Sequence, residues 1–202
     1  MGKSQADSPS LNLDDLRAMD SGALLEVMHK GGPLDMEALA GTQHLGVDLS
    51  LPGFMRRLLW LTFRKTFHRD EAGGFVRGWN VKLAQNGIDG EIVPLTDGRG
   101  RPKTFGHYRV KSASGIGFPK GWDGEGRHFL DYGAGGNTFF DGARVGYTPL
   151  VAVNPGSMDL LLGWEVVRIL GVKLPLKLYW ALRLQGPLDE VVATPRAGAV
   201  RS

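Results

Sequence analysis

Residues 174–184, LPLKLYWALRL, carry an apolar side chain at every second position. Residues 158–166, MDLLLGWEV, alternate in the same way. Strict alternation is typical of a β-strand with one buried face and one face in water. Because only a few residues separate the two stretches, they predict an antiparallel hairpin. The pair therefore favours a mostly antiparallel β fold over a parallel cofactor-binding sheet.

Further short segments of the same kind continue along the chain, separated by turn dipeptides such as Asn-Gly, Asp-Gly and Pro-Gly. We expect a closed barrel rather than a sandwich, because closure removes the exposed strand edges. The predicted strands cover residues 42–49, 74–84, 89–94, 104–113, 127–133, 147–154, 158–169 and 174–185.

Two helical regions are expected before the main run of strands. Residues 11–40 predict short helices, with Asp20 as an N-cap. Residues 51–69 predict one amphipathic helix that caps the barrel, because Phe63, Phe67 and other apolar residues recur at roughly helical spacing. All its charges are basic, so contact with an anionic membrane surface is the alternative to capping.

The fold class is therefore α+β, an antiparallel β-barrel of about eight strands with N-terminal helices and one capping helix. We expect residues 1–10 and 190–202 to be disordered tails, 11–40 a helical segment, and 41–189 the barrel. The polar N-terminus and the lack of about 20 consecutive apolar residues favour a cytoplasmic protein without a transmembrane helix.

Composition excludes some chemistry and suggests partners. The 202 residues include no cysteine, which excludes disulfides, thiolate zinc sites and a cysteine nucleophile. Residues 1–48 hold three basic and eight acidic side chains, a net of −5, whereas the rest carries +8. This asymmetry predicts contact with an anion, with a membrane surface or between the two parts of the chain, and the last is favoured.

The usual catalytic and cofactor signatures are missing from the sequence. We therefore expect no cofactor and no metal. His107 and Asp131, with His128 nearby in the predicted sheet, are weak candidates for moving a proton. The segment Arg99-Gly100-Arg101-Pro102 matches the core of an AT-hook, which binds A·T-rich minor grooves. Because it lies where a hairpin loop is expected, we do not expect nucleic-acid binding.

Arg77 shares one face of the predicted strand 74–84 with Trp79. An unpaired buried cation would cost several kcal/mol. Arg77 therefore needs a carboxylate partner, for which Asp131 is a candidate, a water-filled cavity or an anionic ligand. In the last case, Arg77 would bind the carboxylate of an otherwise apolar ligand. The predicted ligand-binding residues are Arg77, Trp79, Tyr108, Trp164 and Trp180.

Four short motifs carry a family resemblance: RGWN at 77–80, GHY at 106–108, LDYG at 130–133 and DLLLG at 159–163. Over residues 39–185 the chain resembles small uncharacterised bacterial proteins with a lipocalin-like barrel. The resemblance implies a barrel that holds a small hydrophobic ligand, including lipids. Lipocalins proper place the Gly-x-Trp motif near the N-terminus of a secreted, usually disulfide-bonded barrel, and this chain departs from that pattern.

The leading functional hypothesis is non-catalytic binding of a small, largely apolar ligand, acids included. One alternative is a barrel enzyme of isomerase or cyclase type, acting on an apolar substrate with His107 or Asp131 moving a proton. Another is a peripheral membrane or interaction module that uses the basic helix 51–69.

Overall fold

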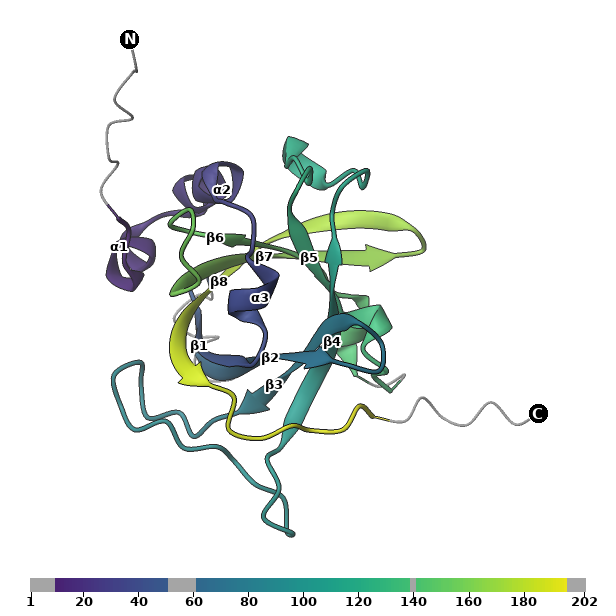
Figure 1. Ribbon diagram of the computed structural model, residues 1–202. Helices are drawn as coiled ribbons and strands as arrows, with labels where there is room; N and C mark the ends of the chain where they lie inside the picture. The colour runs from purple at the N-terminus through teal and green to yellow at the C-terminus, as the bar shows by residue number, and fades with distance from the viewer. Residues whose placement is uncertain (1–9, 51–60, 139–140, 196–202) are drawn as a thin grey trace, which may run out of the picture.

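The computed structural model describes residues 10–50, 61–138 and 141–195. Within these residues, eight antiparallel strands close into one barrel, in which each strand pairs with the next and β8 returns to pair with β1 (Figure 1). The α+β barrel predicted from the sequence is thereby confirmed. The strands are β1 (Thr42–Asp48), β2 (Thr62–Asp70), β3 (Phe75–Lys82), β4 (Thr104–Ser112), β5 (His128–Asp131), β6 (Tyr147–Ala152), β7 (Leu160–Ile169) and β8 (Val172–Pro187).

Three short α-helices precede the barrel in the described chain: α1 (Leu13–Ala18), α2 (Ser21–Lys30) and α3 (Met36–Leu39). Each begins at a side chain that accepts hydrogen bonds from free backbone N–H groups. Asn12 forms a capping box with Asp15 at α1, and Asp20 caps α2 as predicted. Short 3-10 turns η2 (Pro119–Gly121), η3 (Tyr132–Ala134) and η4 (Gly142–Val145) lie between later strands.

The prediction of a capping helix over residues 51–69 was wrong for its second half. Residues 51–60 lie outside the described part of the chain, and Thr62–Asp70 forms strand β2. Phe63 and Phe67 caused the error, because a spacing of four residues puts two side chains on one face of a helix and also of a strand. The β-branched Thr62 and Thr66 suit the strand.

The prediction of a strand over 89–94 was also wrong. These residues belong to the long loop between β3 and β4, where the contact with the sheet is an isolated bridge between Leu83 and Pro94. Side chains shape this loop: the Asn86 amide donates to the Glu91 carbonyl at 2.9 Å. The predicted number of strands still agrees with the observed eight. The two errors cancel, because 62–70 is a strand and 89–94 is not.

Alternating side chains divide the apolar residues into two cores. One fills the barrel and includes Phe67, Leu150, Leu161 and Leu182, with Leu39 of α3 at one end. The other lies on the outer face of β6, β7, β8 and β1, where α1, α2 and the loop after β4 cover it. Figure 1 views the barrel end-on, with α1 and α2 outside its wall and α3 across its opening.

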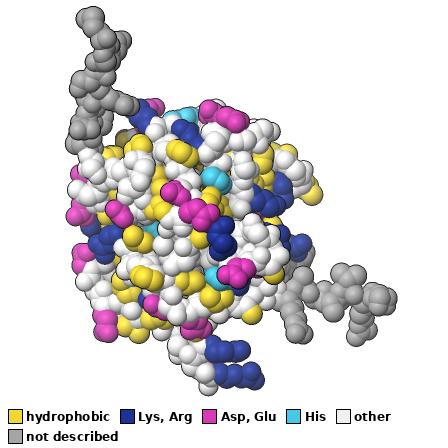
Figure 2. Space-filling model, viewed as in Figure 1, with side chains coloured by type: hydrophobic (Ala, Val, Ile, Leu, Met, Phe, Trp, Pro, Cys, Tyr) yellow, Lys and Arg dark blue, Asp and Glu magenta, His cyan; other side chains and the backbone are white. Residues whose placement is uncertain are grey.

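Charged side chains of both signs are interspersed on the face in Figure 2, with basic groups at the tip of the loop at the foot of the view. The ion pair of Arg69 on β2 with Glu37 on α3, at 2.7 Å, joins the acidic N-terminal part to the basic barrel. In the described ranges, no helix has the length and apolar character needed to cross a membrane.

Candidate functional site

The structure separates the five predicted ligand-binding residues. Tyr108 and Trp180 point into the barrel and belong to its interior core. Trp164 stacks on Tyr179 in the outer core, with ring centroids 6.4 Å apart. Trp79 lies between the inward-facing Gly78 and Asn80 on β3, so its ring is on the outer face as well. The five therefore do not line a common cavity.

Arg77 shares the outer face of β3 with Trp79, as the alternation predicted, but its partners are different from those expected. Its guanidinium lies 3.4 Å from the Asp70 carboxylate and donates to the Val192 carbonyl at 2.9 Å. It also lies over the Trp79 ring, 5.1 Å from the centroid. Through its hydrogen bond, Arg77 holds the segment around Val192, after β8, against the outer face of β3.

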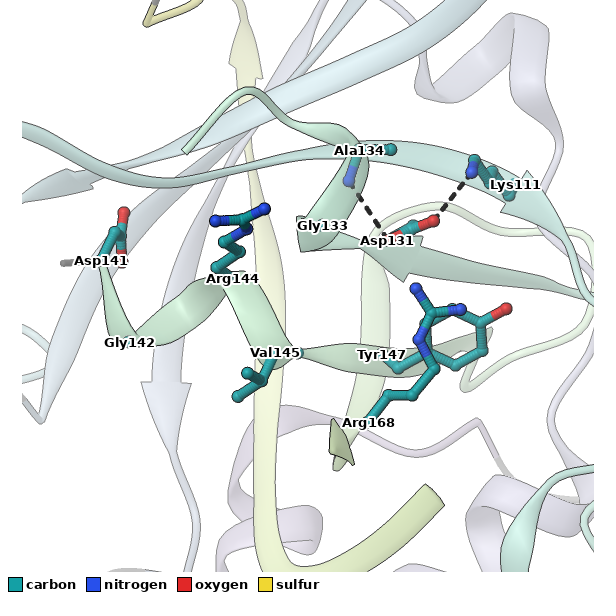
Figure 3. Close-up of a pocket in the computed structure, with 11 residues that line it drawn as sticks. Lys111, Asp131, Gly133, Ala134, Asp141, Gly142, Arg144, Val145, Tyr147 and Arg168 are labelled. Atoms are coloured by element: carbon teal, nitrogen blue, oxygen red, sulfur yellow. Dashed lines mark hydrogen bonds and ion pairs between the residues drawn. The ribbon is translucent and has the colours of Figure 1, made fainter. Parts of the chain in front are cut away.

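Asp131, the predicted partner of Arg77, is held elsewhere. Its carboxylate accepts from Lys111 at 2.7 Å and from the backbone N–H of Ala134 (Figure 3). It borders a surface hollow of about 720 Å³, beside which Arg144 and Arg168 extend. These groups surround an open hollow on the outer side of the barrel.

His107 lines a different hollow from Asp131, next to Arg77. Its Nε2 lies 3.2 Å from the Thr104 hydroxyl, and burial, helped by the charge of Arg77, lowers its pKa to about 4. His128 occupies the opposite face of β5 from Asp131, since the two are three residues apart on one strand. The structure therefore does not bring His107, His128 and Asp131 together as a proton-transfer group.

A cavity of about 530 Å³ opens inside the barrel at the end opposite α3. Its apolar wall comes from Phe63, Phe105, Leu178 and Trp180. Its polar groups come from several strands, and they are Asp48, Lys65, Asn80, Tyr132 and Glu165. The rest of the interior is filled by the apolar core, so the cavity takes up one end of the barrel only.

Lys65, on β2, is the centre of this site. Its side chain is 1% exposed, and its Nζ donates to Asn80 Oδ1 at 2.7 Å and to the Tyr132 hydroxyl at 2.8 Å. The nitrogen also lies 4.6 Å from the ring centroids of both Tyr108 and Trp180. Burial lowers the pKa of Lys65 to about 7, against an opposing effect of Glu165.

Glu165, on β7, lies in the wall near Lys65. Burial raises the pKa of its carboxyl group, and Lys65, Thr148 and Trp180 partly offset that shift. The Thr148 hydroxyl donates to Glu165 Oε2 at 3.2 Å. Burial likewise raises the pKa of Tyr132, with the Glu165 charge acting in the same direction. Near neutral pH the site can therefore hold a neutral amine beside a phenol and a carboxyl group whose pKa is raised.

Sequence reasoning missed Lys65 and Glu165. Lys65 was placed in a helix, although Phe63-Arg-Lys65-Thr-Phe67 also puts the lysine between two aromatic residues on one strand face. That pattern is the signal that could have revealed it. Glu165 was assigned to the wet face of its strand because Trp164 and Val166 are apolar, whereas β7 buries both faces.

Searches against protein-family models, curated proteins and solved structures found no match for this chain. The lipocalin-like resemblance thus stays a prediction. What supports the barrel is its strand pairing, and what supports the candidate site is the geometry of its residues.

Proposed function

We propose that this protein binds a small, largely apolar molecule inside the barrel, with the polar head of that molecule at Lys65. The observation that carries the proposal is the cavity of about 530 Å³ with aromatic walls and one buried amine. Small-molecule sites typically have ~300–1,000 Å³, with apolar walls and a few placed polar groups. The Lys65 site meets each of these criteria.

The charges of the wall favour a particular kind of head group. Lys65 supplies one amine, at most half of it charged above pH 7, while Asp48 and Glu165 supply two carboxyl groups in the same cavity. A ligand carboxylate bound at Lys65 would lie near these two carboxyl groups, and their ionised forms would repel it. A neutral oxygen, such as that of a carbonyl or hydroxyl group, can accept a hydrogen bond from Lys65 without this repulsion. We therefore place uncharged apolar ligands ahead of acids.

A fluorescent, uncharged probe tests the proposal directly. N-phenyl-1-naphthylamine is an apolar dye whose emission rises in an apolar environment. Leu178→Trp would fill the cavity, whereas Leu174→Trp makes the same change on β8 at a side chain that is 44% exposed. We expect at least tenfold weaker dye binding in Leu178→Trp and wild-type binding in Leu174→Trp. Equal binding by all three proteins would contradict the proposal.

Native mass spectrometry of the purified protein provides a second test. A compound bound at one per chain, released on denaturation and analysed, would identify the chemical class. The Leu178→Trp protein should carry less of it than the Leu174→Trp control. A compound retained equally by both variants would place its binding outside the cavity.

A barrel enzyme acting on an apolar substrate is the second candidate, and the Lys65, Tyr132 and Glu165 group favours it. Burial lowers the pKa of Lys65 and raises that of Glu165, so both move toward pH 7, where proton transfer is most effective. The test is exchange of the α-protons of a simple ketone, cyclohexanone, in deuterated water, followed by NMR. Exchange that Lys65→Met abolishes would support catalysis; a rate equal to the buffer rate would exclude it for this substrate.

Membrane contact through residues 51–69 stays a prediction. In β2 the Phe63 ring points into the barrel, so it is not available to a membrane surface. The other residues on which that alternative depends, such as Trp60, lie outside the described part of the chain.

A further inference from the structure

We infer that Lys65 captures aldehydes or ketones covalently, as an imine between its Nζ and the carbonyl carbon of an apolar ligand. This inference rests on the proposed function, because the ligand must first enter the same cavity. It adds the chemical class of the ligand and the bond that holds it.

The position of Lys65 supports this chemistry. A lysine acts as a nucleophile only as the neutral amine, and an apolar surrounding is what favours that form. Nζ lies among the rings of Phe63, Tyr108, Tyr132 and Trp180, with centroid distances from 4.6 to 5.5 Å. Nζ donates hydrogen bonds to Asn80 and Tyr132, neither of which is a carboxylate.

The titratable groups around Lys65 are of two kinds: neutral groups, and carboxyl groups, of which Glu165 opposes the neutral amine without outweighing burial. On β1, opposite Lys65, His44 is held neutral because burial lowers its pKa to about 4. Tyr108 on β4 and Tyr132 after β5 have pKa values raised by burial, so both are uncharged. Asp48 on β1 and Glu165 on β7 are the acidic groups of the wall, and burial raises the pKa of Glu165.

The reaction needs no co-reactant. The lone pair of Nζ attacks the carbonyl carbon, and the carbonyl oxygen takes a proton to give a carbinolamine. Loss of the hydroxyl group as water, with the remaining N–H proton, forms the C=N bond. One carbonyl and one amine give one imine and one water, without oxidation or reduction. The Tyr132 hydroxyl, 2.8 Å from Nζ, and the Glu165 carboxyl group are placed to relay these protons.

Selectivity for Lys65 over the other lysines follows from the fraction of neutral amine. At pH 7 a lysine with a pKa of about 7 is half neutral, whereas an ordinary lysine, with a pKa of ~10.4, is neutral in fewer than ~1 in 10³ molecules. The Lys65 amine should therefore react about 10³-fold faster than an exposed lysine of equal intrinsic reactivity.

Reductive trapping with decanal tests the inference. Wild-type protein is treated at pH 7 with decanal and cyanoborohydride, which supplies the hydride that reduces the imine to a stable secondary amine. Intact and peptide mass spectrometry then locate the decyl group. We expect a decyl group at Lys65 in the wild type, no labelled lysine in Lys65→Met, and wild-type labelling of Lys65 in Lys177→Met, which removes an exposed lysine of β8. Prior saturation with N-phenyl-1-naphthylamine should protect Lys65 from the label.

Dye binding separates the two ways in which the experiment can fail. If the dye binds in the cavity but decanal labels all lysines alike, or spares Lys65, the imine inference is overturned and the binding function stands. If the dye does not bind and Lys65 is not labelled, both fail. Protection by the dye is measured on wild-type protein, so the inference is tested even if Lys65→Met does not fold.

Discussion

Replacing Lys65 by methionine should remove a pH dependence of stability that the wild-type protein shows between pH 7 and 9. The pKa of Lys65 falls from 10.5 in the unfolded chain to about 7 in the folded one. In this window the unfolded state binds a proton at Lys65 that the folded state increasingly lacks. Stability therefore rises with pH, because it rises wherever the unfolded state binds more protons.

The size of the effect follows from the same two pKa values. Each pH unit within the window corresponds to at most about 1.4 kcal/mol. Because Lys65 is still half protonated at pH 7, the gain from pH 7 to 9 comes to about 2 kcal/mol. Over the whole interval between the two pKa values, the free energy of unfolding would rise by about 5 kcal/mol. This is an upper value, because Glu165 partly stabilises the charged form of the buried amine.

The other buried groups with shifted pKa values act at different pH or in the opposite direction. His44 and His107, with pKa values of about 4, increase stability as the pH rises from 4 to 6.5. Glu165 has a raised pKa, so its contribution is lost as the pH rises above its unfolded value of 4.5. Tyr108 and Tyr132 lower stability only above pH 10, where the unfolded phenols ionise. Of these groups, Lys65 is the one whose titration raises stability from pH 7 to 9.

The assay is urea unfolding of wild-type, Lys65→Met and Lys177→Met proteins at pH 7, 8 and 9. The free energy of unfolding should rise by about 2 kcal/mol for wild type and Lys177→Met, and stay nearly level for Lys65→Met. Subtracting the variant cancels the smaller contribution of Lys173, whose pKa is also lowered. Parallel profiles for wild type and Lys65→Met would refute a neutral buried lysine.

Three further predictions separate the cavity from the rest of the fold. Met28→Ala, in the outer core, should cost about 2–5 kcal/mol in urea unfolding and leave the dye affinity unchanged at low temperature. Gly163→Ala places a methyl group in the space of the Trp180 ring, so both stability, by about 1–3 kcal/mol, and dye affinity should fall. Arg77→Leu should speed proteolysis near Val192 without weakening dye binding; a weaker dye would put Arg77 at the ligand after all.

Local patterns were enough to predict much of the architecture. Seven strands, all except β2, lie where alternation and turn residues placed them. The Asp20 cap was predictable because capping depends on a side chain and the backbone next to it. Residues 62–70 were not, because apolar residues four apart satisfy both the helical and the strand period.

Which face of a strand points inward could not be read from the chain alone. Alternation correctly put Arg77 and Trp79 on one face of β3, but that face is the outer one. The outer wall is covered by helices and by the segment after β8, so an apolar face there looks in sequence like a barrel lining. Of the predicted aromatic residues, Tyr108 and Trp180 face the interior.

The sequence by itself determined seven of the eight strands, most of the turns between them and hence an antiparallel barrel, since each depends on residues close together in the chain. Tertiary structure alone decided the site. Lys65, Asn80, Tyr132 and Glu165 come from different parts of the barrel wall and meet only when β8 closes on β1. The lowered pKa of Lys65 arises from that closure, because the rings that exclude water from its amine come from strands far apart in the chain.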